Sequence, residues 1–383
     1  MAQLLQIAGG VLLALSLAGG GYMLLAGALV RRRFGVPDAA LQPGAAPGVD
    51  VLKPLHGDEP GLEAALAGLF AQDYPGEVRV IFGVQDPADP ALAVARRLQA
   101  AHPERDVAVV VDPRQHGSNR KVSNLINMAA VARHELILLA DSDIVAPPDY
   151  LRRVLAPLAE PKVGAVTCAY YGAPQGRGLW PRLAAMGLSC QFLPSVVVGT
   201  AIGLAHPCMG STIAMRRAVL GEVGGLPAFA DKLADDYAIG EAVRAAGYAC
   251  ELSPVLVGHL CAEASLKELL AHELRWARTI RGVDPLGFAG SVVTYPVPVA
   301  VLGLAVLQGA AAGWAVFALA LASRLWLIRQ VEKAAGPIPG SWRLLVLRDM
   351  LSLFVFARSY FVRVVRWRGA RFRVDARGDL SGA

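Results

Sequence analysis

Two carboxylates end an apolar run at residues 136–143, where Leu-Ile-Leu-Leu-Ala is followed by Asp141, Ser142 and Asp143. Such a run suits a buried strand, and in open α/β sheets ligands bind in the crevice beyond the carboxyl ends of the strands. Carboxylate oxygens are the ligands that Mg²⁺ or Mn²⁺ prefers when a substrate phosphate shares the ion. Because an Asp-x-Asp spacing also arises by chance about once in a chain of this length, the prediction depends on partners elsewhere in the sequence.

Two upstream segments carry charged residues in positions that suit a phosphate-bearing ligand. Asp86 follows an apolar strand pattern at residues 78–84, although an Asp-Pro pair is also a common turn initiator. Lys121 lies in a Gly-Ser-Asn-Arg-Lys loop before a predicted helix at residues 124–132. A helix N-terminus beside a lysine is a natural phosphate site, and a solvated basic loop is the alternative.

Two downstream segments add an acidic pair and a basic aromatic motif. Asp235 and Asp236 precede a helical pattern at residues 238–246, where simple N-capping is the alternative explanation. His272, Arg275 and Trp276 come shortly before a long apolar segment. They fit either an ordinary interfacial helix or an arginine clamp on a diphosphate with the indole available for packing.

The elements that must position these residues alternate between strand and helix. Strand patterns occupy residues 49–55, 78–84, 107–111 and the run that ends at Asp141, and helical patterns occupy 61–72, 91–101 and 124–132. Alternation at these lengths predicts βαβ units in an α/β fold with a mainly parallel sheet. Right-handed crossovers then bring the strand ends, and Asp86 with Asp141, to one ligand-binding edge.

The composition indicates membrane segments as well, because 55% of the residues are hydrophobic and the mean hydropathy is +0.44. Residues 7–30 carry no charge and are succeeded at once by Arg31, Arg32 and Arg33, the reverse of the order in a cleaved signal peptide. We therefore expect a retained anchor, and the positive-inside rule puts the chain after Arg33 in the cytoplasm.

The C-terminal part holds further apolar segments. Residues 288–323 are free of charge and fit two short spans that turn near residues 309–313, with Trp314, Arg324, Trp326 and Arg329 where interfacial anchors are expected. A third segment at residues 344–362 contains Arg348, Asp349 and Arg358. It is predicted to be re-entrant, interfacial or packed on the other spans, because buried charge in lipid is expensive and a full crossing would export the basic tail.

These features divide the chain into an N-terminal transmembrane anchor (1–33), a linker (34–48), a cytoplasmic α/β domain (49–287), a transmembrane hairpin (288–329) and a C-terminal part with a re-entrant or third membrane segment and a basic tail (330–383). The net charge of +6 is concentrated beside the apolar segments, which favours a bilayer with anionic lipid over nucleic acid as partner. None of the five cysteines has a Cys-x-x-Cys neighbour, so free thiols are expected.

The ordered set of motifs resembles the processive-type inverting glycosyltransferases with the D, D, D, (Q/R)xxRW pattern, and more closely the ceramide glucosyltransferase family. Within it the chain is similar to the bacterial hopanoid-biosynthesis-associated glycosyltransferases, and the likeness covers nearly the whole sequence. The similar stretches are Val84–Pro90, Asn119–Asn127, Met209–Ser211, Ala234–Tyr237 and His272–Thr279.

The resemblance implies a GT-A fold for residues 49–287, a UDP-sugar donor and a role for each motif. Asp236 matches the general base, Asp143 the ligand of Mg²⁺ or Mn²⁺, and Asp86 a nucleotide contact. The remaining donor-binding positions are Lys121, Asp141, His272, Arg275 and Trp276. The sequence departs from the pattern at His272, where Gln or Arg is usual, and at Asp235, where relatives more often have Glu.

The family also implies the acceptor and the location. A lipid acceptor is expected, because the Arg-Trp motif lies about a dozen residues before the charge-free hairpin. The resemblance implies a bacteriohopanepolyol acceptor, N-acetylglucosamine as the sugar, and a multi-pass protein of the bacterial inner membrane with its catalytic domain in the cytoplasm. The alternatives are a ceramide or diacylglycerol glucosyltransferase and, in another class, an inactive membrane-tethered scaffold that binds a nucleotide sugar.

Overall fold

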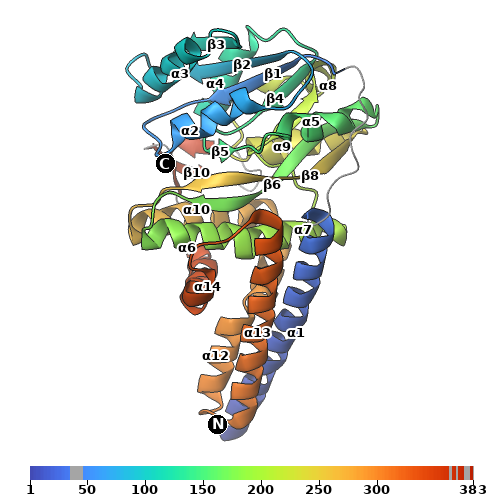
Figure 1. Ribbon diagram of the computed structural model, residues 1–383. Helices are drawn as coiled ribbons and strands as arrows, with labels where there is room; N and C mark the ends of the chain where they lie inside the picture. The colour runs from blue at the N-terminus through green and yellow to red at the C-terminus, as the bar shows by residue number, and fades with distance from the viewer. Residues whose placement is uncertain (35–45, 362–364, 368–369, 375–379, 383) are drawn as a thin grey trace.

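The computed structural model describes residues 1–34, 46–361, 365–367, 370–374 and 380–382. An α/β domain stands on a bundle of long helices, and the N-terminus lies at the far end of that bundle (Figure 1). Most of the predicted linker (34–48) and part of the basic tail (363–377) lie outside the described residues.

The α/β domain contains an eight-stranded mixed sheet with the order β3-β2-β1-β4-β7-β6-β8-β5. β1, β2, β3 and β4 are parallel, β7 runs antiparallel between β4 and β6, and β8 pairs parallel with β6 and antiparallel with β5. The strands are β1 (Val49–Pro54), β2 (Val78–Val84), β3 (Asp106–Val111), β4 (Leu136–Leu139), β5 (Ile144–Val145), β6 (Val163–Pro174), β7 (Ile213–Arg216) and β8 (Ala249–Cys261). The predicted α/β class, with a mainly parallel mixed sheet, is confirmed.

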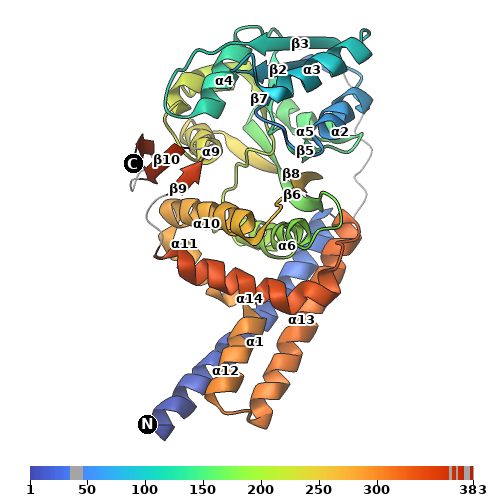
Figure 2. The ribbon, with the colours of Figure 1, turned by 90° about the vertical axis from the view of Figure 1, so that its left-hand side faces the viewer.

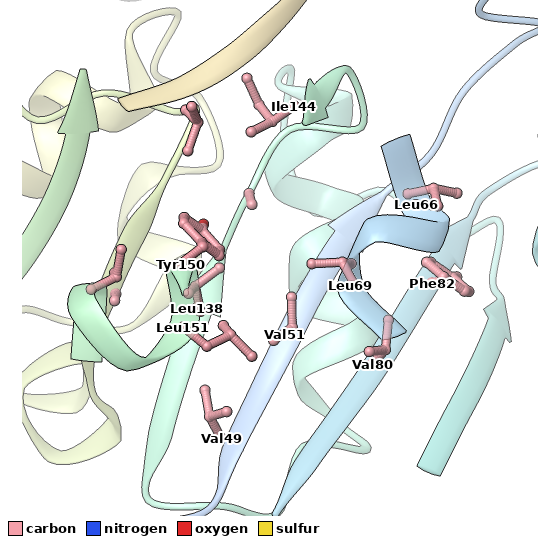
Figure 3. Packing of buried hydrophobic residues seen from close by; sticks show 14 of the residues in the cluster. Val49, Val51, Leu66, Leu69, Val80, Phe82, Leu138, Ile144, Tyr150 and Leu151 are labelled. Atoms are coloured by element: carbon pink, nitrogen blue, oxygen red, sulfur yellow. The ribbon is translucent and has the colours of Figure 1, made fainter. Parts of the chain in front are cut away.

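Apolar residues on both faces of the central strands explain why this sheet forms inside the domain. Leu136 and Leu138 of β4 belong to one core, and Ile137 and Leu139 to the core on the opposite face, as the twofold alternation of a strand requires. The first core lies between the sheet and the helices α2 and α5, where Tyr150 packs near Leu138 (Figure 3). A sheet buried on both faces exposes its functional groups only at the strand ends.

Helices cover both faces of the sheet. They are α2 (Leu62–Ala67), η1 (Gly68–Ala71), α3 (Pro90–Ala101), α4 (Arg120–Ala129), α5 (Tyr150–Leu155), η2 (Ala156–Ala159), α8 (Arg217–Glu222), η4 (Leu226–Phe229) and α9 (Asp235–Ala245). α4 and α9 begin several residues earlier than the sequence pattern predicts, at Arg120 and Asp235. α4 starts at Arg120 because the Asn119 side chain caps it, accepting a hydrogen bond from the Val122 amide at 3.1 Å. Lys121 is therefore in the first turn of a helix rather than in a loop before it.

The membrane part contains the helices α1 (Ala2–Phe34), α11 (Pro285–Gly290), η5 (Ser291–Thr294), α12 (Pro296–Val306) and α13 (Ala311–Ala335). α1 and α13 are long and apolar enough to cross a bilayer, and α11–η5 with α12 form a pair bent by 69°. The chain turns between α12 and α13 at residues 307–310, near the predicted position. Glycines let these helices approach closely, since a Cβ on Gly27 of α1 would overlap the Trp326 ring of α13.

A long apolar helix that the sequence analysis did not single out lies at the base of the α/β domain. It runs from Leu179 to Ala201 as α6 (Leu179–Gly187), a π-helical turn η3 (Leu188–Phe192) and α7 (Leu193–Ala201). By length and composition it could cross a membrane, but 61% of an apolar stretch of 18 residues within it is buried, and the helix lies across the direction of α1 and α13 (Figures 1 and 2).

Two more helices connect the α/β domain to the bundle, α10 (Leu266–Val283) and α14 (Ser341–Ser359). α14 packs against α10, α6 and α12 and lies across the bundle below the α/β domain (Figure 2). Arg324, which we predicted to be an interfacial anchor, is completely buried and pairs with Asp349 of α14 at 2.6 Å. The described C-terminal strands β9 (Val365–Trp367), β10 (Ala370–Val374) and β11 (Leu380–Gly382) form an antiparallel sheet.

The polarity of α14 is inverted with respect to a helix on a water-exposed surface. Its buried face is Ser341, Leu345, Arg348, Asp349, Ser352, Val355 and Ser359. The large apolar side chains of α14 that are exposed are Trp342, Val346, Leu347, Met350 and Phe354. Arg343 and Arg358, near the two ends of α14, are also exposed. A helix with buried charges and an apolar outer face between terminal arginines is suited to a lipid interface.

Candidate active site

The parallel strands β1, β2 and β4 bring three charged residues to one edge of the sheet. Lys53 is near the carboxyl end of β1, Asp86 follows β2, and Asp141 follows β4. β1 pairs with both neighbours in register, so the strand ends lie side by side. This is the edge at which ligands bind in open α/β sheets.

Lys121 links this edge to the start of α9. Its ammonium lies 2.8 Å from Asp141 Oδ1 and 3.3 Å from Asp235 Oδ2. Asn119, which caps α4, also donates from Nδ2 to Asp235 Oδ1 at 3.3 Å. Burial lowers the pKa of Lys121, but the surrounding carboxylates Asp141, Asp235 and Asp236 outweigh this and raise it far above its usual value. The lysine is thus a permanent cation in the site.

Gly210 lies between the side chains that converge here. A Cβ at this position would lie 2.9 Å from Lys121 Nζ, 3.1 Å from Asp141 Oδ2 and 3.4 Å from Asp236 Oδ2. The Gly210 amide donates a hydrogen bond to Asp236 Oδ2 at 2.8 Å, and its carbonyl accepts one from the Asp141 amide at 3.3 Å. The absence of a side chain on Gly210 is what lets Lys121, Asp141 and Asp236 share one space.

The surroundings of Asp236 favour a carboxylate that can accept a proton near neutral pH. Burial and the nearby charge of Asp235 raise the pKa of Asp236 to about 6, against the lowering effect of Lys121 and of the Gly210 and Tyr237 amides. A base works best when its pKa lies close to the working pH. Asp236 is therefore ionised at neutral pH and is still basic enough to take a proton.

Asp143 has the properties of a cation ligand. Burial raises its pKa, but His259, Lys53 and His272 outweigh this and lower the pKa of Asp143 to about 2. Its Oδ1 is buried without a hydrogen-bond partner, and His259 Nδ1 lies 3.5 Å away, at the outer limit for such a bond. An ionised carboxylate with a free buried oxygen fits a hard divalent ion.

The protein would supply only part of such an ion's coordination. Among the described residues, no group of three or more His, Cys, Asp or Glu side chains is placed to hold a metal ion. Asp143 and its neighbour Asp141 would leave the remaining positions to ligand oxygens and water. This fits Mg²⁺, which proteins commonly bind through one or two carboxylates together with substrate phosphates.

Lys53 is a functional candidate that was not predicted from the sequence. Its side chain is 1% exposed and donates a hydrogen bond to the Asp141 carbonyl at 2.6 Å. Burial lowers the pKa of Lys53 to about 8, although Asp143, Asp141 and Glu59 act in the opposite direction. A lysine that interrupts an apolar strand pattern just before the strand end is a signal that could have found it.

The motif on α10 forms an aromatic cluster beside Asp143. The Trp276 ring is 4.7 Å from His272 and 5.8 Å from His259, measured between ring centroids, and 6.2 Å from Tyr170 of β6. His272 Nδ1 is 2.8 Å from Glu263 Oε1, which fixes the imidazole. His259 joins this cluster to the acidic edge, because its Nδ1 lies 3.5 Å from Asp143 Oδ1.

Arg275 extends from the same helix near this cluster. Burial raises the pKa of Tyr170 far above its usual value, and the charge of Arg275 acts on that phenol in the opposite direction. Arg275 thus acts electrostatically on Tyr170, one of the rings that Trp276 contacts. His259, Tyr170 and Gly210 were not predicted as site residues, since none of them follows a strand end or belongs to a charged motif.

Asp86 lines a cavity of about 310 Å³ on the same edge of the sheet. The cavity is lined by Leu55, Gln85, Asp86, Pro113, Gln115 and Arg120, among others. Asp86 Oδ1 accepts a hydrogen bond from the Ala88 amide at 2.8 Å, as in an Asp-Pro turn. Asp86 can initiate the turn and also contact a ligand in the cavity, because its Oδ2 takes no part in this hydrogen bond.

Comparison with known proteins adds a family match over most of the chain. The sequence profile described as Glycosyl transferase family 21 matches residues 11–380. Ceramide glucosyltransferase 1 of Caenorhabditis elegans is 24% identical over 353 residues, covering 87% of this chain and 73% of that protein. An N-acetylglucosaminyltransferase of Rhizobium meliloti is 25% identical over 287 residues, covering 69% of this chain and 65% of that protein.

Among solved structures, a mannosyltransferase from Pyrobaculum calidifontis in complex with GDP-Man and Mn²⁺ resembles the chain with a TM-score of 0.49 and 22% identity. The similarity covers 92% of this chain and 99% of that one.

Proposed function

The chain belongs to glycosyl transferase family 21 and is a nucleotide-sugar-dependent glycosyltransferase, and from this premise we propose that it transfers a sugar from a UDP-sugar to a hydroxyl of a membrane lipid. The observation that carries the proposal is the convergence of Lys121, Asp141 and Asp236 on Gly210, with Asp143 two residues beyond Asp141. This arrangement offers both cationic and basic groups at the ligand-binding edge of the sheet.

Asp236 is proposed to be the general base. The hydroxyl of an acceptor has a pKa far above neutrality, so its proton must be taken up as the oxygen attacks the sugar. Asp236 is held by the Gly210 and Tyr237 amides, each at 2.8 Å, and its raised pKa suits proton uptake. Direct attack opposite the departing UDP inverts the anomeric centre and gives a β-linkage from an α-linked donor.

The positive charges of the site are proposed to stabilise the departing diphosphate. Lys121 is a largely enclosed cation at the edge of the sheet, with 14% of its side chain exposed. Arg275 and Trp276 lie on α10, the helix that borders Asp143 through His259 and His272. Fixed charges in a site that excludes water stabilise developing negative charge without reorganisation. Asp86 is proposed to contact the nucleotide at its cavity.

A divalent cation, Mg²⁺ or Mn²⁺, is proposed as the cofactor, with Asp143 as its ligand and Asp141 beside it. When bound there, the ion would neutralise charge on the diphosphate. The ionised, partly unpartnered carboxylate of Asp143 supports this assignment.

The acceptor is proposed to be a bacteriohopanepolyol and the sugar N-acetylglucosamine. The lipid nature of the acceptor is supported by the apolar helices below the site and by the ceramide glucosyltransferase relative. The relative that is an N-acetylglucosaminyltransferase supports the sugar. The second candidate is transfer of glucose to ceramide, which the C. elegans relative favours.

Transfer of one sugar to one lipid is expected when membranes that contain the protein are incubated with a panel of UDP-sugars and lipid extracts. Mass spectrometry of the lipid product would measure the mass of the transferred sugar and of the acceptor in one experiment. Addition of a single N-acetylhexosamine to a hopanoid polyol would support the first candidate, and a hexosylceramide would support the second. A polymer, or no lipid product from any donor, would contradict the proposed function.

The protein is proposed to lie in the bacterial inner membrane with the α/β domain in the cytoplasm. Arg31, Arg32 and Arg33 end α1 beside that domain, and Arg33 donates to the Leu252 carbonyl of β8. Positive residues favour the cytoplasmic side. α14 is proposed to lie in the plane of the interface with its apolar outer face in lipid, so that the tail stays on the side of the α/β domain.

This topology predicts that a protease added to the cytoplasmic face of sealed vesicles removes a C-terminal tag. A tag at the N-terminus should be protected under the same conditions, because α1 places it on the opposite side. Vesicles of inverted orientation provide the control. Protection of the C-terminal tag from the cytoplasmic side would show that α14 crosses the bilayer.

A further inference from the structure

We infer that Arg348 of α14 is a positioning residue for the donor site, because through Glu273 it holds α10 and thereby Arg275 and Trp276 in place. The inference rests on the proposed function, since it assumes that Arg275 and Trp276 face the nucleotide diphosphate. Neither Arg348 nor Glu273 needs to contact a substrate for this role.

The contact between Arg348 and Glu273 has a fixed geometry. Arg348 Nη1 donates to Glu273 Oε1 at 2.5 Å, and Nη2 donates to Oε2 at 2.8 Å. Such a two-pronged pair of guanidinium and carboxylate fixes orientation as well as distance. The Arg348 side chain is 4% exposed and that of Glu273 is 18% exposed, so water screens the pair little.

Three helices meet at this pair. Arg348 Nη1 also donates to the Leu183 carbonyl of α6 at 3.1 Å, and Nε donates to Ser352 at 3.1 Å. A Cβ on Gly187 of α6 would lie only 3.2 Å from Arg348 Cζ and 3.4 Å from Glu273 Oε1. The guanidinium is therefore enclosed by α6, α10 and α14, and all of its nitrogens have acceptors.

α14 is itself held to the membrane helices by the residue next to Arg348. Asp349 accepts hydrogen bonds from Arg324 of α13 at 2.6 and 2.8 Å, and Arg324 Nη1 also donates to the Cys190 carbonyl at 2.8 Å. Cys190 lies in the π-helical turn η3, a distortion that changes the carbonyl pattern of a helix. Adjacent residues of α14 thus bind α13 on one side and α10 on the other.

Glu273 is well placed to transmit this restraint along α10. Residues three and four apart on a helix are neighbours on its surface, so Glu273 lies beside Trp276, and His272 packs on Trp276 with ring centroids 4.7 Å apart. A helix moves as a rigid unit over such a distance. Releasing Glu273 from α14 would therefore shift Arg275 and Trp276 together.

The test compares the binding of UDP with Mn²⁺ in Glu273→Gln, Arg348→Met and the double variant, using the full-length protein in detergent and isothermal titration calorimetry. Each single variant is expected to weaken UDP binding by about 10–10²-fold, as small misplacements in a site do. The double variant should be no weaker than the worse single variant, because both remove the same restraint. The donor KM should rise in parallel.

Arg343→Met is the matched control, since Arg343 is an exposed arginine on the same helix and should leave UDP binding unchanged. Thermal unfolding reports whether each variant is folded. If Arg348→Met does not fold, the UDP affinity of Glu273→Gln tests the inference on its own. A folded Glu273→Gln with UDP affinity within about twofold of the original protein would overturn the inference. If the original protein binds UDP but glycosylates no lipid, the proposed function fails, whereas the comparison of UDP affinities still decides the inference.

Discussion

Replacing Asp236 with Asn is expected to lower kcat by about 10²–10⁴-fold, the range that a positioned general base contributes. The amide keeps the shape of the carboxylate, but it has one acceptor oxygen in place of two. It can therefore accept only one of the hydrogen bonds from the Gly210 and Tyr237 amides, and it cannot take up a proton. The donor KM should change little, because Asp236 is proposed to act on the acceptor. Steady-state kinetics with a fixed lipid acceptor would measure both constants.

The pH dependence of the reaction provides a second test of the role of Asp236. Because the pKa of Asp236 is raised to about 6, the carboxylate is protonated below that pH and ionised above it. The rate should therefore fall as the pH drops through about 6 and reach a plateau above it. The Asn variant should lack this acidic limb, since it has no proton to lose at that position.

Glu241→Gln is the matched control for Asp236→Asn. Glu241 is a half-exposed carboxylate on the same helix, α9, where it pairs with Arg244. The control should retain the kcat and the pH profile of the original protein. Full turnover in Asp236→Asn would remove Asp236 from the mechanism and leave its raised pKa as a property of the buried acidic pair.

The second large effect is expected from Asp143→Asn, which should lower kcat by about 10²–10³-fold, as the loss of one group that stabilises developing charge typically does. Chelation with EDTA should abolish activity of the original protein, and excess Mn²⁺ should restore it. The Asn variant should need a higher Mn²⁺ concentration and recover only in part. Titration of activity with Mn²⁺ in both proteins would measure the difference.

Asp73→Asn serves as the control for this experiment, because the Asp73 side chain is 68% exposed and pairs at the surface with Arg152. It should match the original protein at every Mn²⁺ concentration. Full turnover of Asp143→Asn in the presence of EDTA would rule out the metal assignment while leaving Lys121 and Arg275 as the cations of the site.

The sequence predicts the acidic edge of the sheet well, because its determinants are local. An apolar run that ends in Asp141 gives β4, and the alternation of strand and helix patterns gives the parallel order that places Asp86 and Asp141 at one edge. The predicted start of α4 was wrong by four residues, because the helix is capped by the Asn119 side chain and begins before the apolar periodicity on which the prediction relied.

Other features depend on contacts between distant parts of the chain. Arg324 looks like an interfacial anchor in the sequence, and its burial depends on Asp349, a residue of another helix. His259 lies inside β8 with no motif around it, and it reaches Asp143 only because β5 and β8 pair in register. The apolar character of the helix from Leu179 to Ala201 is visible in the sequence, but its position beneath the sheet depends on tertiary packing.

The buried pair of Arg324 and Asp349 has a consequence for how the chain assembles during synthesis. α13 is synthesised before α14, so Arg324 has no paired carboxylate until Asp349, 25 residues later in the sequence, has been made. An unpaired arginine in a lipid environment is costly, and the Cys190 carbonyl alone does not neutralise its charge. α14 is therefore required for α13 to reach its final arrangement, and Arg324 is neutralised only after α14 has been made.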